Sequence, residues 1–131
     1  MSKVGIIGTG DKFEALATLL AQTDTKVLLY NHDRRSRKEL PRGVTTVGLD
    51  HFQDVPVVFI SLPIDSVRSV ARELGEHITG RHAVIHLCRN FEHRTLKTVS
   101  QILAEETPTR RFGFLTGPMR KEDVDSGLPA S

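Results

Sequence analysis

A glycine-containing turn at the end of an apolar run is the part of this chain best suited to bind a phosphate. Residues 3–7 (Lys-Val-Gly-Ile-Ile) predict a buried strand, Gly8-Thr9-Gly10 predicts a tight turn, and Phe13 to Ala21 predicts a helix. Glycines let the backbone approach an anion closely, and the free amides of a helix N-terminus attract negative charge. The pattern therefore predicts a nucleotide-binding turn, although Phe13 stands where the third glycine of G-x-G-x-x-G belongs.

Two further residues of this turn carry charge, Asp11 and Lys12. The carboxylate of Asp11 would add negative charge beside a bound pyrophosphate. It would equally serve as a helix cap, accepting hydrogen bonds from amides that the phosphate would otherwise use. Both interpretations remain open from the sequence.

A second polar segment, Asn31-His32-Asp33, follows the apolar run from Lys26 to Tyr30, and Arg34-Arg35 comes directly after it. Enzymes that bind NAD often place an acidic residue at this point for the ribose hydroxyls, whereas basic residues suit a 2′-phosphate. The segment therefore favours NADP over NAD. A solvated loop is the alternative interpretation of the basic cluster.

Strand-like and helix-like segments alternate along the whole chain. Strands are predicted over residues 3–7, 26–30, 44–47, 55–62, 83–87 and 112–115; helical spacing marks 13–21, 64–78 and 96–103. Gly75 falls inside the second of these helices and is expected to end it early. The alternation predicts one doubly wound parallel α/β domain, and ligands of such domains bind beyond the carboxyl ends of the strands.

Four motifs, the last of them in two parts, resemble in order those of the N-terminal domain of NAD(P)-dependent glycerol-3-phosphate dehydrogenase. The family's G-x-G-x-W-G-T-A-L-A corresponds to residues 8–17, its V-P-S-x-x-x-R to 62–68 and its K-G-I-E-x-x-T-L to 89–96; S-G-P-x-x-A-x-E-V and G-x-P-T-A correspond to 116–124 and 127–131. The resemblance covers the chain, residues 1–131, as a Rossmann-like domain with strand order 3-2-1-4-5-6. It implies a dinucleotide-binding site formed by Gly8, Thr9, Gly10, Asp11, Lys12, Phe13, Asn31, His32, Arg34, Leu62, Pro63 and Arg89.

The sequence departs from the family pattern at positions that matter for catalysis and substrate binding. Arg89 stands at the position of an active-site lysine, and arginine, unlike lysine, stays charged at any ordinary pH. The resemblance also implies a C-terminal helical domain that supplies the substrate contacts, and the sequence given stops before it. No residue is therefore assigned as catalytic, and the chain alone is expected to be inactive.

Net charge and the cysteine and histidine content indicate which partners, cellular locations and metal sites to expect. The net charge is only +2, so charge gives no reason to expect a nucleic-acid or membrane partner. The single cysteine, Cys88, excludes an intrachain disulfide, and the sequence shows neither a signal peptide nor a membrane span, so a cytoplasmic location is expected. The histidines lack metal-ligand spacing, and no metal is predicted; His86 and Cys88 are read as packed or hydrogen-bonded side chains rather than ligands.

Two functions remain open. In the first, the chain is the dinucleotide-binding half of a dehydrogenase-like protein, holding NAD or NADP weakly. In the second, it is a pseudoenzyme that serves as an interaction or regulatory module. In either case we expect a homodimer or a dedicated protein partner, with contacts near Leu115, Met119, Val124 and Leu128, unless these residues fold back on their own sheet.

Overall fold

A computed structural model describes residues 2–8, 11–23, 25–31, 43–87 and 90–115, and of residues 2, 11–14 and 31 the backbone alone. Its strands are β1 (Ser2–Gly8), β2 (Thr25–Asn31), β3 (Val44–Thr46), β4 (Val57–Ser61), β5 (Ala83–His86) and β6 (Arg111–Phe114). Its helices are α1 (Asp11–Ala21), α2 (Ile64–Gly75) and α3 (Val99–Glu106), with the short 3-10 helix η1 (Leu49–Asp54). The predicted segments are thus confirmed, with ends that differ by a few residues.

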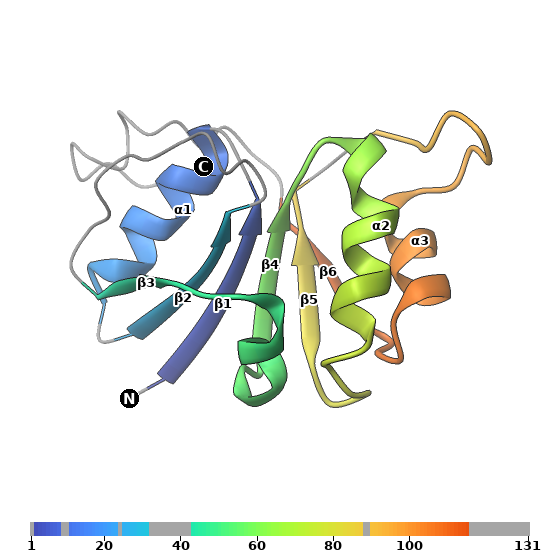
Figure 1. Cartoon of the computed structure of the whole chain (residues 1–131). Helices are drawn as coiled ribbons and strands as arrows, with labels where there is room; N and C mark the ends of the chain where they lie inside the picture. Colours follow the sequence, from blue (N-terminus) through green and yellow to red (C-terminus); the bar gives the residue numbers. More distant parts are fainter. Residues whose placement is uncertain (1, 9–10, 24, 32–42, 88–89, 116–131) are drawn as a thin grey trace.

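The six strands form one sheet in the order β3-β2-β1-β4-β5-β6, and all neighbours pair in parallel (Figure 1). This is the predicted order. The outermost strands are short: β3 has three residues and β6 has four. The chain leaves the middle of the sheet at β1, moves outward to β3, and returns to β4 on the other side of β1, which makes the fold doubly wound.

Helices cover both faces of the sheet, as Figure 1 shows. On one face, Leu16 and Ala17 of α1 pack with strand residues Ile6, Val27 and Leu29. On the other, α2, α3 and η1 pack on strand residues that include Ile7, Leu28, Val58, Ile60 and Val84. Alternation along each strand sends successive side chains to opposite faces, which is how β4 contributes to both layers.

Helix α2 confirms its predicted pattern. The apolar residues that repeat at helical spacing are all buried: Ile64, Val67, Val70, Ala71, Leu74 and Ile78. The helix ends at Gly75, as expected, and a Cβ built at Gly75 would overlap the backbone carbonyl oxygen of Glu106. A glycine is therefore needed where the end of α2 meets the end of α3.

The start of α3 corrects the prediction. Leu96 was expected to open this helix, but it lies outside the helix with a φ of 61° and is 74% exposed. The helix begins at Val99 because Thr98 caps it: the Thr98 side chain accepts from the Gln101 amide at 3.2 Å, and the Gln101 side chain accepts from the Thr98 amide at 2.8 Å. This reciprocal pair satisfies two amides that a helix start leaves free.

Candidate active site at the carboxyl edge of the sheet

Three strand ends meet at the centre of the sheet's carboxyl edge. Gly8, the last residue of β1, is in register with Asn31 of β2 on one side and with Ser61 of β4 on the other. Strand order reverses here, since β2 and β4 lead to opposite edges of the sheet. In open parallel sheets this switch point is where ligands bind.

The N-terminus of α1 lies next to this point. Gly8 is buried at the end of β1, and α1 begins at Asp11, so only residues 9–10 separate strand and helix. Buried Ala15 and Ala17 give α1 small side chains towards the sheet. Backbone amides at a helix start are free to donate, and together with the helix dipole they favour a bound anion.

The structure brings the predicted site residues to this edge to different extents. The backbones of Gly8 and Asn31 lie side by side, and Asp11, Lys12 and Phe13 form the first turn of α1, where their side chains fall outside the described part. Thr9, Gly10, His32, Arg34 and Arg89 lie outside the described residues altogether.

Leu62 and Pro63 follow β4 at the same edge. The Leu62 side chain is 6% exposed and belongs to the core beneath α2, so the backbone of Leu62 is what it presents at the edge. Pro63 is exposed and is the N-cap residue of α2, with an extended backbone (φ −58°, ψ 145°) directly before the helix begins at Ile64. The pair therefore fixes how the chain turns from β4 into α2.

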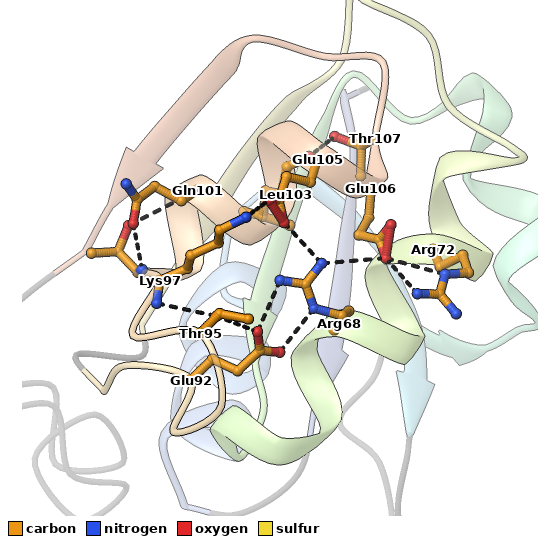
Figure 2. Close-up of polar contacts among 11 residues, drawn as sticks. Arg68, Arg72, Glu92, Thr95, Lys97, Gln101, Leu103, Glu105, Glu106 and Thr107 are labelled. Carbon is orange, nitrogen blue, oxygen red and sulfur yellow. Dashed lines mark hydrogen bonds and ion pairs between the residues drawn. The ribbon is translucent and has the colours of Figure 1, made fainter.

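Beside this edge lies a cluster of charged side chains that the sequence did not reveal (Figure 2). Its central contact joins Arg68 of α2 to Glu92, which lies in the loop between β5 and α3. Arg68 Nε donates to Glu92 Oε2 at 2.8 Å, and Arg68 Nη2 donates to Glu92 Oε1 at 2.9 Å. Two parallel bonds between a guanidinium and a carboxylate fix both position and orientation.

Two glutamates of α3 complete the surroundings of Arg68. Arg68 Nη1 lies 2.9 Å from Glu105 Oε1 and 3.7 Å from Glu106 Oε2. Arg72, one turn further along α2, also donates to Glu106, at 2.9 and 3.1 Å. Lys97 of the loop pairs with Glu105, so three cations meet three carboxylates in this cluster.

These contacts shift the protonation of the acids. The hydrogen bond from Arg68, followed by one from the Thr95 hydroxyl, lowers the pKa of Glu92 to about 2. Lys97 and then Arg68 lower the pKa of Glu105. Glu92 and Glu105 in turn raise the pKa of Arg68. Glu92, Glu105 and Arg68 are thus held in their charged forms, so they join α2, α3 and the loop as ion pairs.

Both residues of the central contact lie in segments that resemble the family, but the sequence alone does not pair them. Arg68 ends the segment compared with V-P-S-x-x-x-R, and Glu92 is the fourth residue of the segment compared with K-G-I-E. The sequence did contain a signal for this ion pair: the two motifs are expected at the same edge of the sheet, and these two residues carry opposite charges. The pairing itself depends on a separation of 24 residues that only the fold closes.

His86 is a packed and hydrogen-bonded residue, as expected. It is 5% exposed, its Nε2 lies 3.0 Å from Ser100 Oγ, and its ring centroid lies 5.1 Å from that of Phe114. Cys88 lies outside the described residues. Within the part of the chain that the structure describes, no group of histidine, cysteine, aspartate or glutamate side chains is placed to hold a metal ion. The described helices include none that is long and apolar enough to cross a membrane.

Comparison with known proteins agrees with this geometry. Residues 48–131 match the family described as NAD-dependent glycerol-3-phosphate dehydrogenase N-terminus. Residues 3–89 also match the family described as NADP oxidoreductase coenzyme F420-dependent. The two matches together extend over both the β1–α1 turn and the Arg68–Glu92 contact.

Curated relatives and a solved structure extend the comparison. The chain is 29% identical to the glycerol-3-phosphate dehydrogenase [NAD(P)+] of an Exiguobacterium species, over 100% of the chain and 44% of that protein. It is 30% identical to the enzyme of the same name from Enterococcus faecalis, over 93% of the chain and 42% of that protein. The crystal structure of glycerol-3-phosphate dehydrogenase from Coxiella burnetii has the same fold, with a TM-score of 0.85 at 17% identity over 98% of the chain and 44% of that structure.

The chain thus spans somewhat less than half the length of the curated relatives that it matches. The family match covers more than half of the chain, and the resemblance in sequence and the strand order agree with it. The chain therefore belongs to the family of the N-terminal domain of NAD-dependent glycerol-3-phosphate dehydrogenases.

Proposed function

We propose that the chain binds a nicotinamide dinucleotide across the carboxyl edge of its sheet, weakly and with NADP ahead of NAD. The observation that carries the proposal is the register of Gly8 with Asn31 and Ser61, at the point where strand order reverses and α1 begins. Membership of the family supports the same ligand class. Backbone amides at a helix start and a glycine at the strand end fit a pyrophosphate.

Each part of the edge has a proposed role towards the dinucleotide. The turn from Gly8 to Gly10, with the first turn of α1, binds the pyrophosphate. Asn31, His32 and Arg34 line the adenosine ribose, where Arg34 would pair with a 2′-phosphate. Leu62, Pro63 and Arg89 border the nicotinamide. When bound, the nicotinamide supplies hydride transfer, while the chain's own residues position it.

We further propose that the chain does not catalyse glycerol-3-phosphate oxidation on its own. Hydride transfer requires the substrate and the nicotinamide to be held in reacting geometry. The relatives that bear the name of this activity are more than twice as long as the part that the chain spans. In addition, the guanidinium of Arg89 can hold a phosphate but cannot give up a proton as a lysine ammonium can.

A second function is a pseudoenzyme module that binds a protein partner. Phe13 in the first turn of α1 favours it, because a ring stands at the position where the nucleotide-binding pattern has a glycine. Exposed apolar side chains, Phe91 at 55% and Phe114 at 46%, also favour it. The two functions differ in whether a dinucleotide binds at all.

Titration calorimetry separates them. NADPH, NADH, NADP⁺ and NAD⁺ are each titrated into the chain at millimolar concentration, with adenosine as the control that lacks the phosphates. Heat with NADPH that exceeds the heat with NADH, and none with adenosine, supports the proposed binding. No heat with any dinucleotide would overturn it and leave the pseudoenzyme function. Glycerol 3-phosphate added with NADP⁺ or NAD⁺ is expected to give no reduced nicotinamide, and turnover would overturn the proposed inactivity.

A further inference from the structure

The loop between β5 and α3 has a defined backbone despite its exposed sequence. The Glu92 amide donates to the Lys97 carbonyl at 2.9 Å, and the Leu96 amide donates to the Glu92 carbonyl at 2.7 Å. Phe91 and Thr98 form an isolated antiparallel bridge. Residues 91–98 therefore form a closed hairpin, which we call the β5–α3 hairpin.

This hairpin contains strain that its own packing does not offset. Leu96 has a φ of 61°, in the left-handed region that disfavours residues with a Cβ. Its side chain is 74% exposed, and that of Phe91 is 55% exposed, so neither gains much from burial. Besides the hydrogen bonds within the hairpin, a contact from outside is therefore expected to help hold this shape.

Arg68 supplies the external contact. The Glu92 carboxylate, within the hairpin, receives two bonds from Arg68, and its Oε1 also accepts from the Thr95 hydroxyl at 2.6 Å. The side chains of Arg68 and Glu92 are only 25% and 18% exposed, so this pair is shielded from water better than an ordinary surface pair. Thr95 is the residue directly before the strained Leu96, so the carboxylate links Arg68 to the turn itself.

The other end of this contact is rigid. Arg68 follows Val67, which is 1% exposed, and α2 is fixed in the core by Val70, Ala71 and Leu74 as well. Glu105 and Glu106 of α3 hold the same guanidinium from its other side. Arg68 thus connects two helices of the core to the hairpin, as Figure 2 shows.

We propose that Arg68 is a positioning residue that holds the β5–α3 hairpin in place and, through it, the carboxyl end of β5 at the dinucleotide site. The link to the dinucleotide rests on the proposed function. Arg89, to which the proposed function gives a place beside the nicotinamide, stands three residues before Glu92 in the sequence. Because so few residues join the hairpin to the end of β5, we expect dinucleotide binding at this edge to depend on Arg68.

Amide hydrogen exchange of the full chain, read by mass spectrometry over residues 90–98, tests the first half of the proposal without any ligand. In Arg68→Ala, exchange in the hairpin is expected to be about tenfold faster, since charged hydrogen bonds of this kind are each equivalent to about that factor. Arg68→Lys keeps the charge but cannot form two parallel bonds. Its exchange rate in the hairpin is therefore expected to lie between those of the parent and of Arg68→Ala. Arg72→Ala is the matched control: it removes an arginine of the same helix that contacts Glu106 but not the hairpin.

Affinity for NADPH, measured on the same variants, tests the second half. The dissociation constant is expected to rise in the order parent, Arg68→Lys, Arg68→Ala, with Arg72→Ala equal to the parent. Unchanged exchange in Arg68→Ala would overturn the proposal, and so would faster exchange that leaves NADPH affinity unchanged. If the parent binds no dinucleotide, the proposed function fails, and the exchange data alone then support or overturn the anchoring of the hairpin by Arg68. If exchange in the hairpin became equally faster in Arg72→Ala, the cause would be a general loosening of α2, and this result would also overturn the proposal.

Discussion

At the scale of single residues, Phe13 is the position that tests the dinucleotide site most directly. It lies in the first turn of α1, where the nucleotide-binding pattern has a glycine. Phe13→Gly is expected to lower the dissociation constant for NADPH, because it restores the glycine of the nucleotide-binding pattern, which lets the backbone approach a pyrophosphate closely. The helix should lose roughly 0.5–1 kcal/mol of stability from the glycine itself.

Phe13→Ala is the control for this change, because it removes the ring and favours the helix. If the ring obstructs the site, both variants bind NADPH more tightly than the parent in a calorimetric titration. Tight binding by the parent, with no gain in either variant, would show that the ring does not obstruct the site.

Arg34 carries the expected preference for NADP. Arg34→Ala should weaken NADPH binding about tenfold, the loss expected for one charge-assisted hydrogen bond, and leave NADH binding unchanged. Fluorescence titration of the two reduced dinucleotides measures this ratio. Arg37→Ala, three residues further along this basic stretch of the sequence, is the control for general charge. An equal loss for NADPH and NADH would contradict a contact to the 2′-phosphate.

At the scale of elements, the meeting of α2 and α3 depends on Gly75. A methyl group there overlaps the backbone carbonyl of Glu106, and backbone cannot move aside as a flexible side chain can. Gly75→Ala is therefore expected to lower the free energy of unfolding by about 1–3 kcal/mol, the usual range for overpacking. Urea denaturation measures the change.

Gly80→Ala is the matched control, since a Cβ there would lie at an ordinary 3.7 Å from the Pro108 carbonyl oxygen. Its unfolding midpoint should stay close to that of the parent. A midpoint for Gly75→Ala that equals the control would show that α3 shifts without cost.

The ion cluster between α2 and the β5–α3 hairpin makes stability depend on pH. The pKa of Glu92 falls from 4.5 to about 2 on folding, so its contribution is complete above pH 4.5 and is lost as pH falls through about 2. The urea midpoint of the parent should therefore decline over this range. In Glu92→Gln, which cannot ionise, the decline should be shallower, and equal slopes would contradict a role for this carboxylate.

The elements themselves were largely predictable, and the exceptions have identifiable causes. Apolar runs and helical spacing located β4 and α2 because each buries several side chains. The 3-10 helix η1 was missed because six residues with only Leu49 and Phe52 buried give no periodic signal. Leu96 was assigned to a helix on spacing alone, although the Thr98–Gln101 capping box marked the true start. The Arg68–Glu92 contact could not be predicted from the sequence, because its two residues are 24 positions apart and only the fold brings them together.

At the scale of the whole molecule, we expect the chain to associate with itself or with a partner. The expectation comes from Met119, Val124 and Leu128, which lie outside the described residues. Leu115 instead packs against the core beneath α1, as the alternative of folding back on the sheet predicts. Sedimentation velocity over a range of concentrations should show a dimer. A monomer at the highest concentration would exclude self-association and leave a different protein as the partner.

The shortness of the outer strands limits how such an association can form. Among the residues that the structure describes, β3 presents three residues at one edge of the sheet and β6 four at the other. Joining sheets edge to edge requires a long row of unpaired amides and carbonyls, and short or charged edges are a common protection against it. Arg111, exposed in β6, adds charge to one of them. Copies of this chain should therefore meet through side chains and helices, and the fold resists the open-ended strand addition that leads to aggregates.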